Sequence, residues 1–296
     1  MHLAVLLWGI TAVLGRAIDL SAPVLVWYRM LMTALFMAGI LYYRKEWVPV
    51  QKNDRRRLFS IGLLIAVHWV AFYGSIKFSN ASVALVCLST ASIFTPLLDQ
   101  FINKTKHKPA ELLLGLLAMA GVYLIYRVQE LYALGVLFGV IAALLSSWFT
   151  VLNKKIAHKY PARTMVFYEM SAGWLLITLL VPLQVMFSPE PVDLIPTNYD
   201  WLWLVVLSLC CTVWAQSLAL NALKHISSFT SSLSLNLEPV YGIILAFIFF
   251  KEYEMLRPEF YMGLTLILLS VLIQMVMLLK PGKKQPSIVE DKSGID

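Results

Sequence analysis

Four ionisable residues lie inside long apolar stretches of this 296-residue chain: Arg29, His68, Glu169 and Glu238. A charge at the middle of a bilayer costs at least about 2.5–3.5 kcal/mol, so such a group usually faces a water-filled cavity or a partner. A guanidinium binds carboxylates, a carboxyl binds cationic groups or carries a proton, and an imidazole can relay protons near neutral pH. The four residues therefore indicate binding of a charged molecule, proton movement, or both. Glu169, Glu238 and His68 are the candidates for proton coupling.

Each of the four also has a structural interpretation. Arg29 and Glu169 could satisfy a loop carbonyl or a neighbouring polar group and hold a helix in place. Glu238 could fix the kink that Pro239 introduces by removing a backbone hydrogen bond. His68 could be a packing residue of an apolar helix. These structural readings stay open at the level of the sequence.

Polar and aromatic side chains recur on single helical faces, as the walls of a pathway for an organic molecule require. Trp8 and Thr11 share one such face, and Trp214 and Ser217 share another. The alternative is adhesion between helices, because Ser, Thr, Asn and Gln form hydrogen bonds across membrane helices. The candidates for substrate binding are Trp8, Thr11, Arg29, His68, Trp69, Tyr73, Tyr168, Glu169, Trp214, Ser217, Asn236, Glu238 and Tyr241.

The elements that must position these residues are membrane helices. Hydrophobic residues make up 59% of the chain and charged residues 14%, whereas soluble proteins have about 45–50% and about 25%. This composition excludes a soluble globular domain and a disordered chain. The net charge of +7 lies in short gaps between apolar runs, so no nucleic-acid partner is expected. No nucleotide loop, metalloprotease motif or Cys/His cluster occurs, so we expect no cofactor and no metal.

Apolar runs of suitable length predict ten spans. They cover residues 2–18, 21–43, 58–78, 81–102, 110–127, 132–152, 162–187, 200–222, 227–250 and 258–279. With the N-terminus in the cytoplasm, the cytoplasmic segments hold 18 of the 24 Lys and Arg residues and the opposite side holds five. This bias predicts that both termini are cytoplasmic. The expected location is the bacterial inner membrane, with the lipid bilayer as a partner.

The two halves of the chain resemble each other. Val26–Met30 matches Val166–Met170, and 110–115 matches 258–263, with offsets of 140–148 residues. An odd number of spans in each half requires the second half to lie upside down relative to the first. The sequence thus predicts an all-α integral membrane protein with ten transmembrane helices in two inverted five-helix repeats, as in secondary transporters. The expected divisions are 1–130, 131–280 and a disordered cytoplasmic tail, 281–296.

These features together resemble the EamA branch of the drug/metabolite transporter superfamily. Trp8-Gly9, Arg29 early in the second span, Glu238-Pro239 and Lys251-Glu252 carry the resemblance, which covers nearly the whole chain. The first half departs from the pattern, because Ala91-Ser92 stands where the second half has Glu238-Pro239. The resemblance implies the ten-span fold and transport of amino acids, metabolites, nucleotide sugars or drugs.

We therefore expect a secondary transporter of a small organic molecule that works by alternating access and is coupled to protons. A zwitterion such as an amino acid is the first expectation for the substrate, and export for the direction. Drugs, nucleosides or sugars are alternative substrates. The rival functions are an intramembrane transferase or hydrolase that uses His68 and a glutamate, and a membrane scaffold or sensor. A homodimer is left open.

Overall fold

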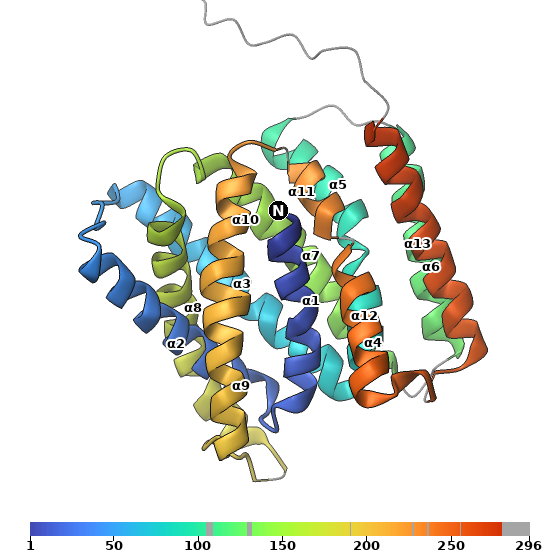
Figure 1. The fold of residues 1–296 in the computed structure, drawn as a ribbon, viewed down its shortest axis with the longest axis horizontal. Helices are drawn as coiled ribbons and strands as arrows, with labels where there is room; N and C mark the ends of the chain where they lie inside the picture. Colours follow the sequence, from blue (N-terminus) through green and yellow to red (C-terminus); the bar gives the residue numbers. More distant parts are fainter. Residues whose placement is uncertain are drawn as a thin grey trace, which may run out of the picture.

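The structure, a computed structural model, describes residues 1–104, 109–128, 132–189, 191–226, 228–235, 237–254 and 256–279. All regular elements in these ranges are helices (Figure 1). They are α1 (His2–Ala17), α2 (Ala22–Tyr43), α3 (Lys52–Phe78), α4 (Ala81–Leu88), α5 (Ala91–Asn103), α6 (Pro109–Val128), α7 (Ala133–Ile156), α8 (Ala162–Phe187), α9 (Asn198–Ser208), the π-helix η2 (Leu209–Trp214), α10 (Ala215–Leu223), α11 (Ser228–Leu235), α12 (Leu237–Phe250), the 3₁₀ turn η3 (Glu252–Glu254) and α13 (Pro258–Leu279).

Six helical segments are long and apolar enough to cross a membrane. They are α2, α3, α4 with α5, α7, α8, and α9 through α10; the apolar parts of α1, α6, α12 and α13 are shorter. Helices satisfy every backbone polar group within one segment, which is why an apolar chain in lipid adopts them. The chain is therefore a multi-pass, all-helical membrane protein, with six spans by these criteria where the sequence predicts ten.

Two predicted continuous helices are interrupted within the described residues. Between α4 and α5 the backbone tightens, with the N–H groups of Ser89 and Thr90 donating to carbonyls only three residues back. The Thr90 hydroxyl also donates to the Cys87 carbonyl at 2.7 Å, a local bond that competes with regular helix geometry. The π-helix η2 separates α9 from α10.

The helices are arranged around pairs that join distant parts of the chain. α2 packs along α8 at one edge of the molecule and α6 along α13 at the other, while α4 contacts α12 near the centre (Figure 1). α3 packs against both α7 and α8, and α1 packs against α12. The helices that pack around the centre thus come from both halves of the sequence.

Glycines let these helices approach closely. A Cβ atom at Gly135 or Gly139 of α7 would lie 2.5–2.6 Å from the Cβ atoms of Ser79 and Cys87, so this GxxxG pair lets α7 pack closely against its neighbours. A Cβ at Gly62 of α3 would lie 2.2 Å from the carbonyl oxygen of Glu169 in α8. The α3–α8 contact therefore fixes the depth of Glu169.

One end of the molecule is held by Glu252. Its buried carboxylate pairs with Arg16 of α1 and accepts hydrogen bonds from the backbone N–H groups of Ala81 and Ser82 at 3.1 and 2.9 Å. A carboxylate at a helix N-terminus satisfies free donors and complements the helix dipole. Glu252 therefore links the start of α4 and the end of α1 to a turn from the second half.

We predict that Gly62→Ala destabilises the protein by about 1–3 kcal/mol, the usual cost of an overpacked core, because the new methyl group must displace the α8 backbone. The measurement is the midpoint of thermal unfolding of purified protein in detergent. Gly39→Ala is the control, because nothing lies within 4 Å of its added Cβ. Equal midpoints for the two variants would refute the proposed α3–α8 contact.

Candidate functional site

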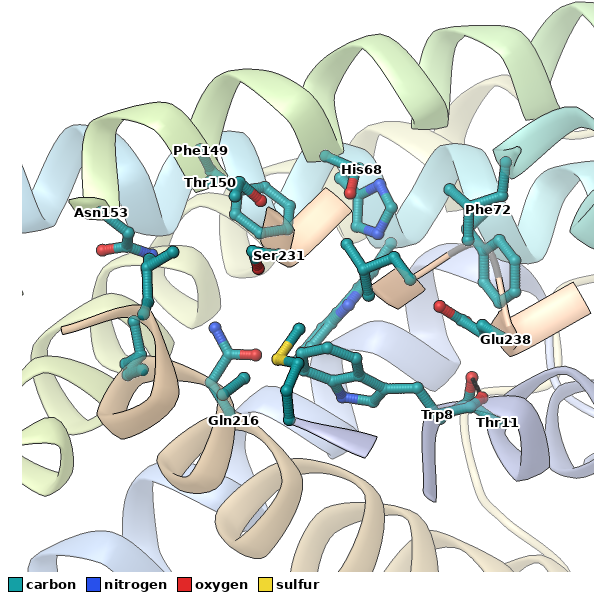
Figure 2. Close-up of a pocket in the computed structure, with 18 of the residues that line it drawn as sticks. Trp8, Thr11, His68, Phe72, Phe149, Thr150, Asn153, Gln216, Ser231 and Glu238 are labelled. Carbon is teal, nitrogen blue, oxygen red and sulfur yellow. Dashed lines mark hydrogen bonds between the residues drawn. The ribbon is translucent and has the colours of Figure 1, made fainter. Parts of the chain in front are cut away.

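A narrow cavity lies at the centre, between α1, α2, α3, α7, α10, α11 and α12 (Figure 2). Its free volume is about 70 Å³, which suits a few water molecules rather than a metabolite. Its polar and aromatic lining consists of Trp8, Thr11, Arg29, His68, Trp69, Phe72, Ser146, Phe149, Thr150, Asn153, Gln216, Ser231 and Glu238. The cavity is thus built from both halves of the chain, and it combines aromatic surfaces with charged groups.

Arg29 is almost fully buried and is held by hydrogen bonds rather than by an ion pair. Its Nη1 donates to the Tyr73 hydroxyl at 2.6 Å, and its Nε donates to the Thr212 hydroxyl at 2.9 Å. Its Cζ lies 3.7 Å from the centre of the Trp69 ring, a cation–π geometry. These contacts fix the guanidinium against one wall while its own charge stays uncompensated by an acid within ion-pair distance in the described chain.

The π-helix η2 between α9 and α10 places two hydrogen-bond acceptors beside the Arg29 guanidinium. Its wider turn exposes the Cys211 carbonyl, which accepts from Nη2 of Arg29 at 3.5 Å, and turns Thr212 toward Nε. Single π-turns occur mostly at functional sites, because the inserted residue frees a carbonyl from the helix ladder. The interruption in this span therefore serves the arginine.

Glu238 lies in α12, directly before Pro239. Its side chain points into the cavity beside Trp8 and Thr11 (Figure 2), is 5% exposed, and makes no hydrogen bond or ion pair within the described residues. Arg29 is close enough to act on this carboxyl electrostatically, although the two are not within 4 Å. An acid and a base therefore face one cavity without neutralising each other directly.

Glu169 is a second buried acid, one side chain behind the cavity wall. It is fully buried, and neither carboxyl oxygen has a hydrogen-bond partner in the described chain. Its polar neighbours are Asn153 and Gln216, which both line the cavity. A change in the orientation of these two amides would connect the carboxyl to the cavity.

His68 lies on the opposite side of the cavity from Trp8 (Figure 2). Its Nδ1 is 2.8 Å from the Ala142 carbonyl oxygen. Because a carbonyl can only accept, Nδ1 carries the proton, and Nε2 of the neutral ring is left as an acceptor. The ring packs against Phe72 and Phe149, so both interpretations of this residue apply: it is packed, and it lines the cavity.

The structure brings together six of the thirteen predicted binding residues as lining: Trp8, Thr11, Arg29, His68, Trp69 and Glu238. Two others support it from behind, Tyr73 under Arg29 and Glu169 beside the two amides.

Four predicted residues lie elsewhere, and one cannot be placed. Trp214 and Ser217 line a separate groove, Tyr168 lies in a shallow hollow near Phe59, and Tyr241 packs against the backbone of Gly9. Asn236 is outside the described residues.

Several lining residues were not among the predicted ones. Asn153 follows Ser146 and Thr150 on one face of α7, so a polar stripe marks it in the sequence, whereas the sequence signal for Gln216 and Ser231 is weak. Trp214 of η2 and Ser217 of α10 do share a face, as predicted, but periodicity does not show which space that face lines. Trp214, which is 59% exposed, turns that face outward and leaves Gln216 on the cavity side.

Comparisons with known proteins find a matching family model, related transporters and a similar fold. The sequence model of the EamA-like transporter family matches residues 1–127 and 133–276. The chain is 22% identical to an uncharacterized transporter of Bacillus subtilis (strain 168), covering 96% of this chain and 90% of that protein. It is 26% identical to an uncharacterized transporter of Archaeoglobus fulgidus, covering 80% and 81%. A solved crystal structure matches with a TM-score of 0.65 over 93% of this chain and 94% of that one; at 16% identity this likeness concerns the fold alone.

We predict that Arg29→Lys lowers stability, because one ammonium cannot reach the Tyr73, Thr212 and Cys211 acceptors together. Each lost charge-assisted hydrogen bond is worth about 1.5–3 kcal/mol. The readout is thermal unfolding in detergent, compared with Arg56→Lys, which alters an exposed arginine whose side chain makes no hydrogen bond in the described chain. Unchanged stability of Arg29→Lys would show that these contacts do not hold the guanidinium.

Proposed function

The chain belongs to the EamA-like transporter family, and we propose that it is a secondary active transporter of a small zwitterionic metabolite, such as an amino acid. One observation carries the substrate class: Arg29 and Glu238 face the same cavity as separate charges. A zwitterion offers a carboxylate to the guanidinium and an ammonium to the carboxylate. The aromatic rings of Trp8 and Trp69 provide apolar surface between them.

The proposed architecture is ten spans in two inverted repeats, over residues 1–130 and 131–280. Two features support it. The family model matches two separate stretches of similar length. The pairs α2–α8, α6–α13 and α4–α12 each join elements that hold the same place in the two halves, as a twofold relation requires near its axis.

The proposed mechanism is alternating access. The cavity is too small for a metabolite in this conformation, so binding requires the helices from the two halves to move apart. Breaks in membrane helices are tolerated where they line a cavity, and they supply the hinges for such movement. Because charges are distributed with the excess of Lys and Arg at one end, we place both termini in the cytoplasm of a bacterial cell and the protein in the inner membrane.

We further propose export coupled to protons through Glu238, Glu169 and His68. Glu238 meets the substrate directly, and Glu169 is reached through Asn153 and Gln216. A buried carboxyl without a counter-ion favours being neutral in a low-dielectric site, and binds a cation or releases a proton when its surroundings change. Competition between a proton and a substrate ammonium for Glu238 would couple the two movements.

An intramembrane enzyme is the less favoured function. General acid–base chemistry needs two groups that converge at hydrogen-bond distance. In the described chain, His68 is bonded to the Ala142 carbonyl and makes no hydrogen bond with a glutamate. Drugs, nucleosides and sugars remain alternative cargoes for the same cavity, and the proposal does not require a homodimer because one chain forms the cavity.

We predict that purified protein in proteoliposomes exchanges labelled amino acids with an internal pool, and that an opposing proton gradient drives net movement. Glu238→Gln should abolish the gradient-driven component, because the amide cannot release a proton. The control is Glu254→Gln, which removes an exposed carboxylate outside the cavity. If Glu238→Gln and the parent share one pH profile between about pH 5 and 8, Glu238 has no coupling role.

We predict that Arg29→Gln weakens binding of amino acids at least tenfold but does not weaken binding of the corresponding amines, which lack the carboxylate. The measurement is competition by unlabelled compounds in the exchange assay. The conservative Arg29→Lys should restore part of the affinity for amino acids. An equal loss of affinity for amino acids and for amines would show that Arg29 has a structural role and does not bind the substrate carboxylate.

A further inference from the structure

A second and larger hollow lies beside the central cavity. This basic groove is formed by the first turns of α1, the end of α2, the start of α8 and one face of α10, and its free volume is about 1140 Å³. The same two helices, α1 and α10, line both spaces with opposite faces. Leu7 and Ser217 face the groove, whereas Trp8 and Gln216 face the cavity.

The lining of the groove carries an excess of positive charge. Arg44, Lys159, Arg163 and Lys224 line it, with Glu46 as its one lining acid. Arg163 is paired with Glu46 at 2.6 Å, and Lys159 is paired at 3.2 Å with Asp54 behind the wall. Arg44 and Lys224 make no side-chain hydrogen bond or ion pair within the described residues. Two cations of the groove are therefore available to an anion.

The groove also has apolar lining residues. Leu3, Leu7, Ile40 and Leu218 line it, and Leu3 and Leu218 are 58% and 38% exposed. In a membrane protein such exposed leucines face lipid chains. Ser217 also lines the groove, and its buried hydroxyl has no hydrogen-bond partner among the described residues. A ligand that matches the groove combines an anionic head, hydrogen-bond acceptors and an apolar tail.

We propose that the basic groove is a binding site for an anionic phospholipid. Its phosphate interacts with Arg44 and Lys224, and an acyl chain lies along Leu3, Leu7 and Leu218. Basic pockets between membrane helices suit anionic head groups, because nearby cations attract the phosphate. A zwitterionic lipid carries its own cation and gains less from the groove.

The site has a consequence for transport. Because α1 and α10 separate the groove from the cavity, a lipid that occupies the groove biases the position of two walls of the central site. A ligand shifts a conformational equilibrium only by its difference in affinity for the two states. The groove is thus a place where membrane composition acts on the transporter from outside its substrate site.

The test is lipid binding by purified full-length protein. Native mass spectrometry and thermal unfolding are measured with phosphatidylglycerol and with phosphatidylcholine of identical acyl chains. We expect the parent to retain phosphatidylglycerol and to be stabilised by it, with at least tenfold preference over phosphatidylcholine. Arg44→Gln combined with Lys224→Gln should lose that preference. Neither side chain makes a hydrogen bond or ion pair with another described group, so folding should be preserved, and the two single variants, each with a partial loss, provide a second test.

The matched control is Lys45→Gln combined with Lys104→Gln, which removes two exposed cations outside the groove and should leave the preference unchanged. Equal retention of the two lipids by the parent would overturn the proposal, as would an equal effect of the two double variants. Soluble glycerol phosphate is the third arm. If it competes with phosphatidylglycerol at comparable concentrations, the groove recognises a soluble anion and the lipid assignment is wrong.

Discussion

A buried arginine is the constraint on which the site depends. A guanidinium without an acidic partner is tolerated inside a membrane protein only if its N–H groups and its planar face have partners. The hydroxyls of Tyr73 and Thr212 accept its hydrogen bonds, and the Trp69 ring covers its face. The π-turn of η2 exists at the point where the Cys211 carbonyl is needed. Holding the cation this way leaves its charge available to the cavity, which a salt bridge with Glu238 would not.

The rest of the molecule keeps the two charges in one space while leaving room for movement. Glycine contacts bring α3 against α8, and Glu252 ties the start of α4 to α1 at one end. Near the cavity the chain is instead interrupted at the α4–α5 turn. Tight contacts away from the cavity and an interrupted helix beside it suit the proposed alternating access, because the central site must open while the halves stay intact.

Much of this was accessible from the sequence, and the exceptions have physical causes. Apolar length predicted the membrane helices, and the cost of a buried charge singled out Arg29 and Glu238, which line the cavity. Trp214 and Ser217 do share one helical face, but that face lines the basic groove and not the central cavity. Periodicity shows which residues share a face and not what lies opposite that face. The π-turn and the roles of Asn153 and Gln216 depend on tertiary contacts that no local pattern encodes.

The most direct test of the account is access to the cavity from each side of the membrane. Thr11 lines the cavity beside Glu238 and Trp8, and Thr11→Cys can be made in a protein whose Cys87, Cys210 and Cys211 are replaced by serine. The Cys211 carbonyl that binds Arg29 is backbone and is kept. The account predicts that a membrane-impermeant thiol reagent modifies the new cysteine when added to either face, and that a transported amino acid slows both reactions. Modification from one face only, under every substrate and pH condition, would contradict alternating access.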